Sequence, residues 1–315
     1  MKALITGGSG FIGSFLAEQI HLSNEVTVLD NLSTGTEENL RNVSNDVNFV
    51  KGDIRDTDLI DSLIKNADLI FHLAAAVGVK NIIDNPQESI STNIYGSENV
   101  LNSATKHNKR IIIASTSEIY GKSTKQPVSE TDDRLIGPPQ QFRWTYSDAK
   151  AIEEGIATYL HAVKKLKVTT VRFFNIVGPR QSSDYGMVLP TFVNNAILNK
   201  PLLVHGDGQQ RRVFCHVKDA VNAFVSLASN DDAIGEVFNV GGSSEISMLD
   251  LAQLVKSLTN SNSEIRLIPY KEVYPVGFED MQRRVPDLSK IKKSINWEPK
   301  FSIEKIILDI TDSLK

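Results

Sequence analysis

The sequence predicts an α/β fold in which helices cover a parallel sheet, and three observations support this prediction. The chain opens with MKALITGGSGFIG, a short apolar segment that runs into a glycine-rich turn. Strand-like and helix-like segments then alternate through the first half, an order typical of parallel strands joined by crossover helices. Near residue 180 the segments become shorter, and the glycine-rich turns HGDGQQ and VGGSSE appear. We therefore expect a Rossmann-type doubly wound sheet with a smaller C-terminal lobe.

The expected elements follow one another without a long gap. Strands are predicted at Lys2–Thr6, EVTVLD, VNFVKGD, Asp68–Ala76, Arg110–Ser115 and KVTTVRFFN. Helices are predicted from Phe11, after an N-cap at Asp56 or Thr57, over residues 86–106, over Ser147–Lys164, and from Ser247 and Ser302. These elements place a dinucleotide-binding domain at 1–180, to which the chain returns near 217–240. Most of 181–315 then forms a substrate-binding lobe.

Composition excludes several classes of protein. The chain has 315 residues, of which 41% are hydrophobic and 23% charged, as in ordinary globular proteins. A net charge of −4 gives no electrostatic reason to expect nucleic acid or an anionic membrane surface as a partner. We recognise no signal peptide, and the longest nearly apolar run, Leu69–Val79, is too short to span a bilayer. We expect a cytoplasmic protein without a metal site, because Cys215 beside His216 is the only cysteine.

The opening turn has the chemistry of a dinucleotide-binding loop. Gly7 permits a tight turn, Gly10 lets the backbone approach a pyrophosphate, and Gly13 lets the helix pack on the strand. The helix N-terminus then faces the phosphates with free N–H groups. Asp30 ends the next predicted strand, where its carboxylate can accept hydrogen bonds from an adenosine ribose. Because a 2′-phosphate would be repelled there and Asn31 offers no cation, the sequence favours NAD over NADP.

A second element, Tyr146-Ser147-Asp148-Ala149-Lys150, indicates acid–base chemistry. Tyr146 and Lys150 lie four positions apart and share one helix face. Such a pair alone is usually a solvated surface, but after a dinucleotide-binding loop it predicts a tyrosine base whose phenolate is favoured by a lysine cation. The hydroxyl-bearing strand end at Ser115, Thr116 and Ser117 comes shortly before and can bond the same substrate oxygen.

The ordered set of motifs resembles a known superfamily over essentially the whole chain. GGSGFIG, DNLSTG, GDIRD, HLAAAVGV, STSEIYG, YSDAK and RFFNIVGPR resemble the extended short-chain dehydrogenase/reductases, in their nucleotide-sugar epimerase, dehydratase and decarboxylase branch. The later segments GDGQQRRVFCHVKD and RRVPDLSKIKKSINWEP resemble the substrate-lobe motifs of that branch.

This resemblance implies a role for each matching position. It implies that NAD is bound by Gly7, Gly10, Phe11, Ile12, Gly13, Asp30, Asn31, Ser33, Asp53, Ile54, Leu73, Ala74, Ala75, Asn93, Ser115, Tyr146, Lys150 and Phe173. It implies that the nucleotide sugar is held by Thr116, Tyr146, Asn175, the turn at Gly186 with Met187, Val188 and Leu189, Val204, Arg212 and Arg284. Arg211 and Arg283 are then expected to face outward. The resemblance also implies a homodimer formed through residues 86–106 and 147–164.

Members of this branch differ in what the 4-keto sugar does after oxidation at C4. A 4,6-dehydratase is disfavoured, because Ser117-Glu118 stands where dehydratases have an acidic pair. The segment HLAAAVGVKNIIDNP favours a UDP-hexose or UDP-hexuronate 4-epimerase, which is our main prediction. Glu118 and Arg143 favour the alternative, a UDP-glucuronate decarboxylase that forms UDP-xylose or a UDP-4-keto-pentose. A silent dinucleotide sensor and a simple ketoreductase are disfavoured by the Tyr146–Lys150 pair and by Asp30, respectively.

Overall fold

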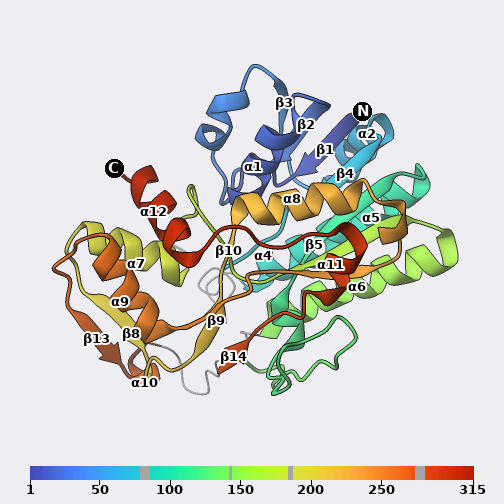
Figure 1. Cartoon of the computed structure of the whole chain (residues 1–315). Helices are drawn as coiled ribbons and strands as arrows, with labels where there is room; N and C mark the ends of the chain where they lie inside the picture. The colour runs from blue at the N-terminus through green and yellow to red at the C-terminus, as the bar shows by residue number, and fades with distance from the viewer. Residues whose placement is uncertain (79–85, 142–143, 184–186, 274–280) are drawn as a thin grey trace.

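Seven parallel strands form the central sheet (Figure 1). The computed structural model describes residues 1–78, 86–141, 144–183, 187–273 and 281–315. The strands are β1 (Lys2–Thr6), β2 (Glu25–Asp30), β3 (Val47–Lys51), β4 (Leu69–His72), β5 (Arg110–Thr116), β6 (Lys167–Phe173) and β11 (Val237–Val240). Their order, β11-β6-β5-β4-β1-β2-β3, reverses direction between β1 and β4. Ligands of open α/β sheets bind at such a reversal, beyond the carboxyl ends of the strands. The predicted fold class is confirmed.

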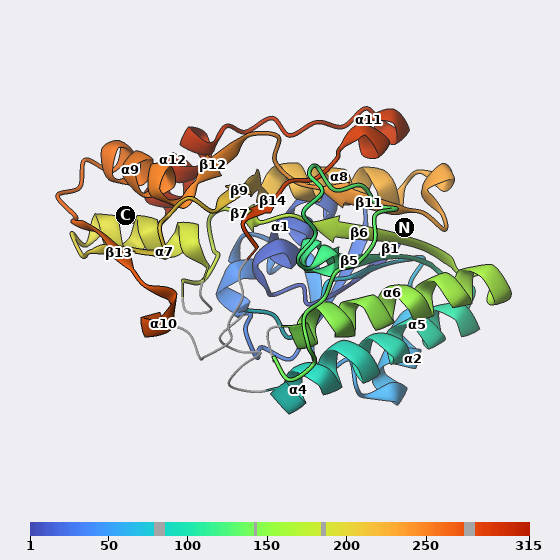
Figure 2. The same cartoon turned by 90° about the horizontal axis from the view of Figure 1, so that it is seen from below.

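Helices cover both faces of this sheet, as Figure 2 shows from below. Helices α1 (Phe11–Ile20) and α8 (Val217–Ala228) cover one face, and α2 (Thr57–Asn66), α5 (Ser97–Lys106) and α6 (Thr145–Lys164) cover the other. Successive strand residues point to opposite faces. Ile112 accordingly packs in the first core, whereas Ile111 and Ile113 pack in the second.

The predicted helix boundaries hold where a capping side chain marks them. The side chains of Asp56, Ser247 and Ser302 accept a hydrogen bond from a backbone N–H in the first turns of α2, α9 (Met248–Leu258) and α12 (Ile303–Ser313). The stretch expected as one helix over 86–106 consists of α4 (Pro86–Ile90), the π-helical η2 (Ser91–Gly96) and α5. Among the described residues, the short 3-10 helices are η1 (Glu37–Val43), η3 (Ser117–Tyr120) and η5 (Asp231–Ala233).

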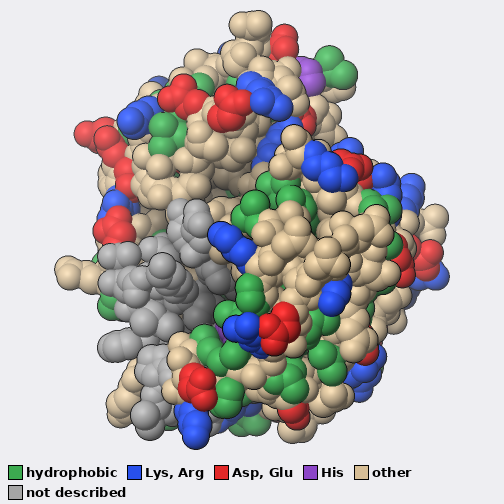
Figure 3. All heavy atoms as spheres, turned by 90° about the vertical axis from the view of Figure 1, so that its left-hand side faces the viewer, with side chains coloured by type: hydrophobic (Ala, Val, Ile, Leu, Met, Phe, Trp, Pro, Cys, Tyr) green, Lys and Arg blue, Asp and Glu red, His purple; other side chains and the backbone are tan. Residues whose placement is uncertain are grey.

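The second lobe is built from short strands on a small helical core. Its strands are β7 (Ile176–Val177), β8 (Leu202–His205), β9 (Arg211–Val213), β10 (Cys215–His216), β12 (Glu245–Ser247), β13 (Ile265–Ile268) and β14 (Arg283–Arg284). Helices α7 (Val188–Ile197), α9 and α12 bury Leu189, Leu251 and Ile307 against one another, and α10 (Tyr270–Val273) lies at the edge. Acidic and basic side chains are interspersed over the face that this lobe presents in Figure 3.

A late segment returns to the sheet, which we did not predict from the sequence. Helix α11 (Ser289–Ile295) packs on β11, and its Ile291 joins the core on the α1–α8 face together with Trp297. The indole of Trp297 donates a hydrogen bond to the carbonyl oxygen of Asp219 on α8 (3.1 Å). Among the described segments, no helix combines the length and the apolar character that crossing a bilayer requires.

Candidate active site

A cavity of about 890 Å³ lies between the sheet and the second lobe. It is lined by the loop after β1, by the ends of β2 and β5 and the loops after them, and from the other side by α7, β8 and β14. All residues predicted to bind cofactor or substrate and described by the structure line it, except Asp53 and Asn93. Residues far apart in the sequence therefore meet in one space.

The turn after β1 is so tight that it has no room for a side chain at Gly7 or Gly13. Gly7 has φ +74°, and a Cβ on Gly13 would lie 2.2 Å from the carbonyl oxygen of Gly7. The N-terminus of α1 consequently opens on the cavity, with Gly10, Phe11 and Ile12 in its lining. Such a glycine cradle at a helix N-terminus suits a pyrophosphate.

Asp30 lies at the end of β2, beside this turn. Its carboxylate accepts hydrogen bonds from the backbone N–H groups of Ser9 (2.9 Å) and Leu32 (2.8 Å). Burial raises the pKa of the Asp30 carboxyl, and these N–H groups oppose the rise. Farther along the cavity, the buried Ser115 hydroxyl has no hydrogen-bond partner among the described residues. The Asp30 carboxylate can accept hydrogen bonds from ribose hydroxyls, and the Ser115 hydroxyl has no partner in the part of the chain that the structure describes, so both groups fit a bound dinucleotide.

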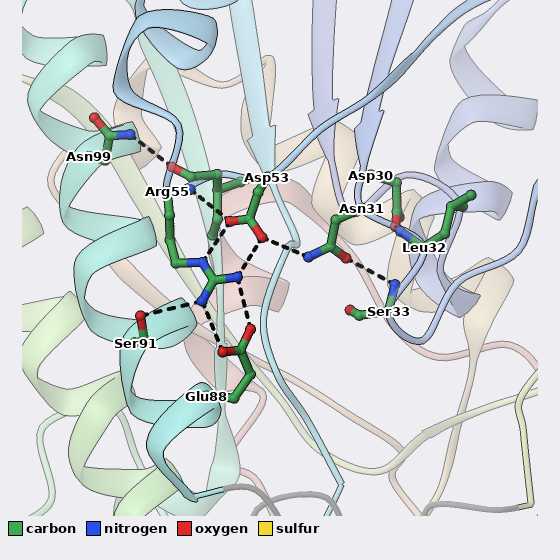
Figure 4. A network of polar contacts seen from close by, with 10 residues as sticks. Asp30, Asn31, Leu32, Ser33, Asp53, Arg55, Glu88, Ser91 and Asn99 are labelled. Atoms are coloured by element: carbon green, nitrogen blue, oxygen red, sulfur yellow. Dashed lines mark hydrogen bonds and ion pairs between the residues drawn. The ribbon is translucent and has the colours of Figure 1, made fainter.

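Asp53 does not line the cavity, because its carboxylate is engaged by neighbouring side chains (Figure 4). Arg55 donates to Asp53 through Nη2 (2.7 Å) and Nε (2.9 Å), and the amide of Asn31 donates to it at 2.9 Å. Arg55 also forms an ion pair with Glu88 of α4 (2.8 Å). The Arg55 guanidinium lowers the pKa of Asp53 well below its usual value. Asp53 thus fixes Asn31 and the loop at Ile54, both of which do line the cavity.

Asn93 is fully buried and acts on the backbone instead of the cavity surface. Its side chain accepts a hydrogen bond from the N–H of Ala76 (2.8 Å) and donates one to the carbonyl oxygen of the same residue (3.0 Å). These two hydrogen bonds to the backbone of one residue fix the segment after β4. Ala74 and Ala75 of that segment line the cavity.

Tyr146 and Lys150 project from the first turns of α6 into the cavity. Lys150 is 2% exposed, and its Nζ donates to the carbonyl oxygen of Ala114 (2.8 Å) and to Glu153 Oε2 (2.7 Å). Burial raises the pKa of the Tyr146 phenol above its usual value, and the carboxylates of Glu153 and Glu118 add to the rise. A nearby cation favours the phenolate, and Lys150, four residues after Tyr146 on α6, is the residue to which the sequence assigns that role.

Thr116 ends β5 and also lines the cavity. Its Oγ1 accepts a hydrogen bond from the N–H of Glu118 (3.1 Å), which caps η3. The hydroxyl hydrogen of Thr116 is consequently available for another acceptor. Ser147, next to Tyr146, donates to the carbonyl oxygen of Glu118 (2.8 Å) and so joins the start of α6 to η3.

Four arginines form two in-register pairs where β14 lies parallel to β9. Arg211 and Arg283 point outward and share the carboxylate of Glu245. Arg212 and Arg284 are buried and line the cavity. This alternation follows from the two-residue period of a strand. The expected inward and outward directions are therefore what the structure shows.

Glu118 meets Arg284 inside the cavity. Arg284 Nη1 forms an ion pair with Glu118 Oε1, and Nη2 donates to Asn175 Oδ1 (3.0 Å). The Asn175 amide in turn donates to the carbonyl oxygen of Val213 on β9 (2.8 Å). Because Glu118 follows Thr116 by two residues, this ion pair lies beside the predicted reacting groups. Arg143, Gly186 and residues 79–85, to which we had assigned roles, lie outside the described residues.

Several polar residues that the sequence did not predict also line the cavity. They are Gln181, Asn195, His205, Gln210 and Tyr270. For Gln210 a signal existed, since it stands two positions before Arg212 and alternation places both on one face. Its amide donates to the carbonyl oxygen of His205 (2.8 Å).

Within the described part of the chain, no cluster of histidine, cysteine and acidic side chains could hold a metal ion. Burial raises the pKa of the Cys215 thiol well above its usual value.

A sequence-family model described as GDP-mannose 4,6-dehydratase matches residues 4–310. The chain belongs to this family. The family lies among the extended short-chain dehydrogenase/reductases that the motifs indicated, so the predicted resemblance is confirmed.

Two relatives of this family member are named decarboxylases. The chain is 41% identical to the UDP-N-acetyl-alpha-D-glucosaminuronate decarboxylase of Bacillus cytotoxicus, over 96% of this chain and 94% of that protein. It is 35% identical to UDP-glucuronic acid decarboxylase 1 of Arabidopsis thaliana, over 97% of this chain and 68% of that protein.

Solved structures of the same fold include enzymes of other activities. One is the UDP-glucose 4-epimerase of Thermotoga maritima with UDP-glucose, with a TM-score of 0.90 and 28% identity over 100% of this chain and 98% of that one. Another is the dTDP-glucose 4,6-dehydratase DesIV of Streptomyces venezuelae with NAD, with a TM-score of 0.89 and 26% identity over 99% of this chain and 96% of that one. The chain is thus an NAD-dependent enzyme of nucleotide-sugar chemistry.

Proposed function

We propose that the protein decarboxylates a UDP-linked hexuronate, with UDP-N-acetyl-α-D-glucosaminuronate as the first candidate and UDP-glucuronate as the second. The observation that carries the proposal is the Glu118–Arg284 ion pair in the cavity, beside Thr116. The names of the two decarboxylase relatives support it. The order of our two sequence predictions is thereby reversed, because the former alternative now has the better support.

NAD fits the residues present, with Gly7, Gly10, Gly13 and Asp30 placed to hold its pyrophosphate and ribose. When bound, it supplies the oxidant for sugar C4 and can return the reducing equivalent later in the cycle. Tyr146 takes the proton of the C4 hydroxyl, and Thr116 donates a hydrogen bond to the same oxygen. Lys150 stabilises the phenolate of Tyr146.

A ketone at C4 lies β to the C6 carboxylate of a hexuronate. The C5–C6 bond therefore breaks with loss of carbon dioxide, and its electron pair moves onto the C4 oxygen as an enolate. Tyr146 and Thr116 bond this oxygen, where the negative charge develops. C5 then takes a proton from solvent, which gives a UDP-4-keto-pentose. If the C4 ketone were reduced again before release, by the NADH that oxidation at C4 would leave bound, the product would be a UDP-pentose.

Arg284 is the group that we assign to the sugar carboxylate. A guanidinium suits a carboxylate, and Arg284 is buried, with 9% of the residue exposed. Glu118 already neutralises part of its charge. Arg284 can thus orient the C6 carboxylate while carrying less than a full positive charge. A full ion pair would stabilise the substrate carboxylate in the ground state and so slow the loss of carbon dioxide.

The proposal is tested by incubating the purified protein, with NAD, separately with UDP-N-acetylglucosaminuronate, UDP-glucuronate and UDP-glucose. Products are identified by proton NMR. We expect a UDP-linked pentose from at least one uronate and no reaction of UDP-glucose. Formation of a 4-epimer with all carbons retained would establish the second candidate, a 4-epimerase, which the fold similarity to the Thermotoga maritima enzyme favours.

We also infer a homodimer, as the family resemblance implies. Large apolar side chains are exposed along the helices expected to form it: Tyr95 on η2 is 64% exposed, and Ile152 and Tyr159 on α6 are 45% and 56% exposed. Helices α5 and α6 lie side by side on one face of the sheet (Figure 2). A second copy packed there would cover these side chains.

A further inference from the structure

The ammonium group of Lys150 is held by two acceptors. It is enclosed between the carbonyl oxygen of Ala114 (2.8 Å) and the carboxylate of Glu153 (2.7 Å). Glu153 is 1% exposed and lies one turn after Lys150 on α6. Burying a carboxylate is costly unless a cation and hydrogen bonds compensate it. The proposed mechanism assigned no task to this buried acid.

The layer behind Glu153 is polar but uncharged. His72 of β4 is fully buried, with Nε2 3.9 Å from Glu153 Oε1 and 2.9 Å from the hydroxyl of Ser97. Its Nδ1 lies 2.7 Å from the hydroxyl of Thr6. Burial lowers the pKa of His72 to about 3, so this ring is neutral at ordinary pH. The cation beside Glu153 is therefore Lys150.

The other charged groups around Tyr146 and Glu153 are compensated elsewhere. Glu118 of η3 is paired with Arg284 of β14, and Glu154 of α6 is paired with Arg172 of β6 at 2.7 Å. Glu153 differs from both, because its partner is the lysine that the tyrosine base depends on.

We propose that Glu153 is a positioning residue for the Tyr146–Lys150 pair: its carboxylate fixes the ammonium against the end of β5 and takes up part of its charge. Glu153 thereby sets how readily Tyr146 releases and regains its proton. The proposal rests on the roles proposed above for Tyr146 and Lys150, and not on which sugar reacts.

The direction of the effect follows from the charges. A carboxylate near Tyr146 disfavours the phenolate, both directly and by weakening the field of Lys150. Removing that charge while keeping the shape of the side chain, as in Glu153→Gln, should make the phenolate easier to form. Glu154→Gln is the matched control. It removes a buried carboxylate at the next position of the same helix, where no hydrogen bond or ion pair to Lys150 exists among the described residues.

The test is a pH titration of Tyr146 by NMR in the NAD-loaded protein, with tyrosine labelled at the ring carbon that bears the hydroxyl. Tyr146→Phe assigns the signal. We expect the midpoint in Glu153→Gln to fall by about one pH unit, and the midpoint in Glu154→Gln to stay at the wild-type value. An unchanged or raised midpoint in Glu153→Gln, or an equal fall in both variants, would overturn the proposal.

A second variant keeps the test decisive if Glu153→Gln does not fold. Glu153→Asp retains the charge but withdraws it from Lys150 by about the length of one carbon–carbon bond. Its midpoint is expected to fall by less than one pH unit, and a midpoint at or above the wild-type value contradicts the proposal. The titration needs no sugar, so its outcome is independent of whether the enzyme decarboxylates or epimerises.

Discussion

At the scale of single residues, two adjacent arginines point in opposite directions, one into the cavity and one to the surface. Arg284 lies in the cavity against Glu118, and Arg283 lies outside against Glu245. We predict that Arg284→Met lowers turnover of a UDP-hexuronate by about two orders of magnitude, because the sugar carboxylate loses its cation. Arg283→Met should change turnover less than about twofold, since exposed ion pairs contribute little. Steady-state kinetics of both variants checks this, and equal losses would place the carboxylate elsewhere.

Tyr146 gives the second prediction at this scale. Tyr146→Phe removes the phenol oxygen but keeps the ring that lines the cavity. Turnover should fall by about two to four orders of magnitude, the range that a general base contributes. NAD affinity, measured by isothermal titration calorimetry, should stay within a few-fold of the wild-type value. Near-normal turnover in this variant would remove the proposed mechanism.

The sequence predicted most residues of the cavity but not how they are paired. Thr116, Tyr146 and Arg284, which motif spacing selected, all line the cavity, and their roles stay predictions. It could not show that Glu118 meets Arg284, because 166 residues separate them. It could not show the task of Glu153 either, since a lysine and a glutamate three residues apart are ordinarily an exposed surface pair. Burial of both side chains, which only the packed fold supplies, makes this pair different.

At the scale of elements, we predict opposite effects on stability for alanine substitutions at two glycines, Gly13 and Gly155. Gly13→Ala places a methyl group 2.2 Å from the carbonyl oxygen of Gly7, so the β1–α1 turn must open. We expect lost NAD binding and a lower melting temperature. Gly155 lies within α6, and no described atom approaches its Cβ position within 4 Å. Gly155→Ala should raise the free energy of unfolding by about 0.5–1 kcal/mol. Thermal denaturation with and without NAD measures both effects, and a stable, NAD-binding Gly13→Ala variant would contradict the account of the turn.

The ion pair between α6 and β6 gives a second prediction for elements. Arg172 donates to both carboxylate oxygens of Glu154 (3.0 and 2.7 Å) and to the hydroxyl of Tyr120 (2.9 Å). Arg172→Met leaves a buried carboxylate without its cation, which costs about 3–5 kcal/mol. Arg41→Met, which breaks an exposed pair with Glu38, should cost less than about 1 kcal/mol. Urea denaturation of the two variants distinguishes these values, and similar losses would show that the buried pair adds no stability.

The strands and helices of the first half could be predicted because they combine clear periodicity with capping residues and turns. The return of α11 to the sheet could not. SKIKKSI gives a short helix with one fully buried residue, Ile291, and nothing local indicates which core receives it. The hydrogen bond from Trp297 to Asp219 and the contacts with β11 decide its place. These are contacts between distant segments.

At the scale of the whole molecule, the exposed apolar face of η2 and α6 predicts self-association. Tyr159→Glu should convert the dimer to a monomer, because it places a charge among the apolar side chains expected at the interface. Leu22→Glu is the control, since Leu22 is 86% exposed but follows α1 on the opposite face of the sheet. Light scattering after size-exclusion chromatography gives the mass. A wild-type monomer, or a Tyr159→Glu dimer, would exclude this interface.

The measurement that tests the central claim most directly determines whether the carboxyl carbon of the substrate is released as carbon dioxide. A UDP-hexuronate labelled in its carboxyl carbon is incubated with the enzyme and NAD, and released carbon dioxide is trapped and compared with the substrate consumed. We predict one labelled carbon dioxide for each sugar nucleotide consumed, with release strongly reduced in Arg284→Met. Label retained in a nucleotide sugar while the substrate is consumed would contradict decarboxylation and leave the 4-epimerase as the better-supported candidate.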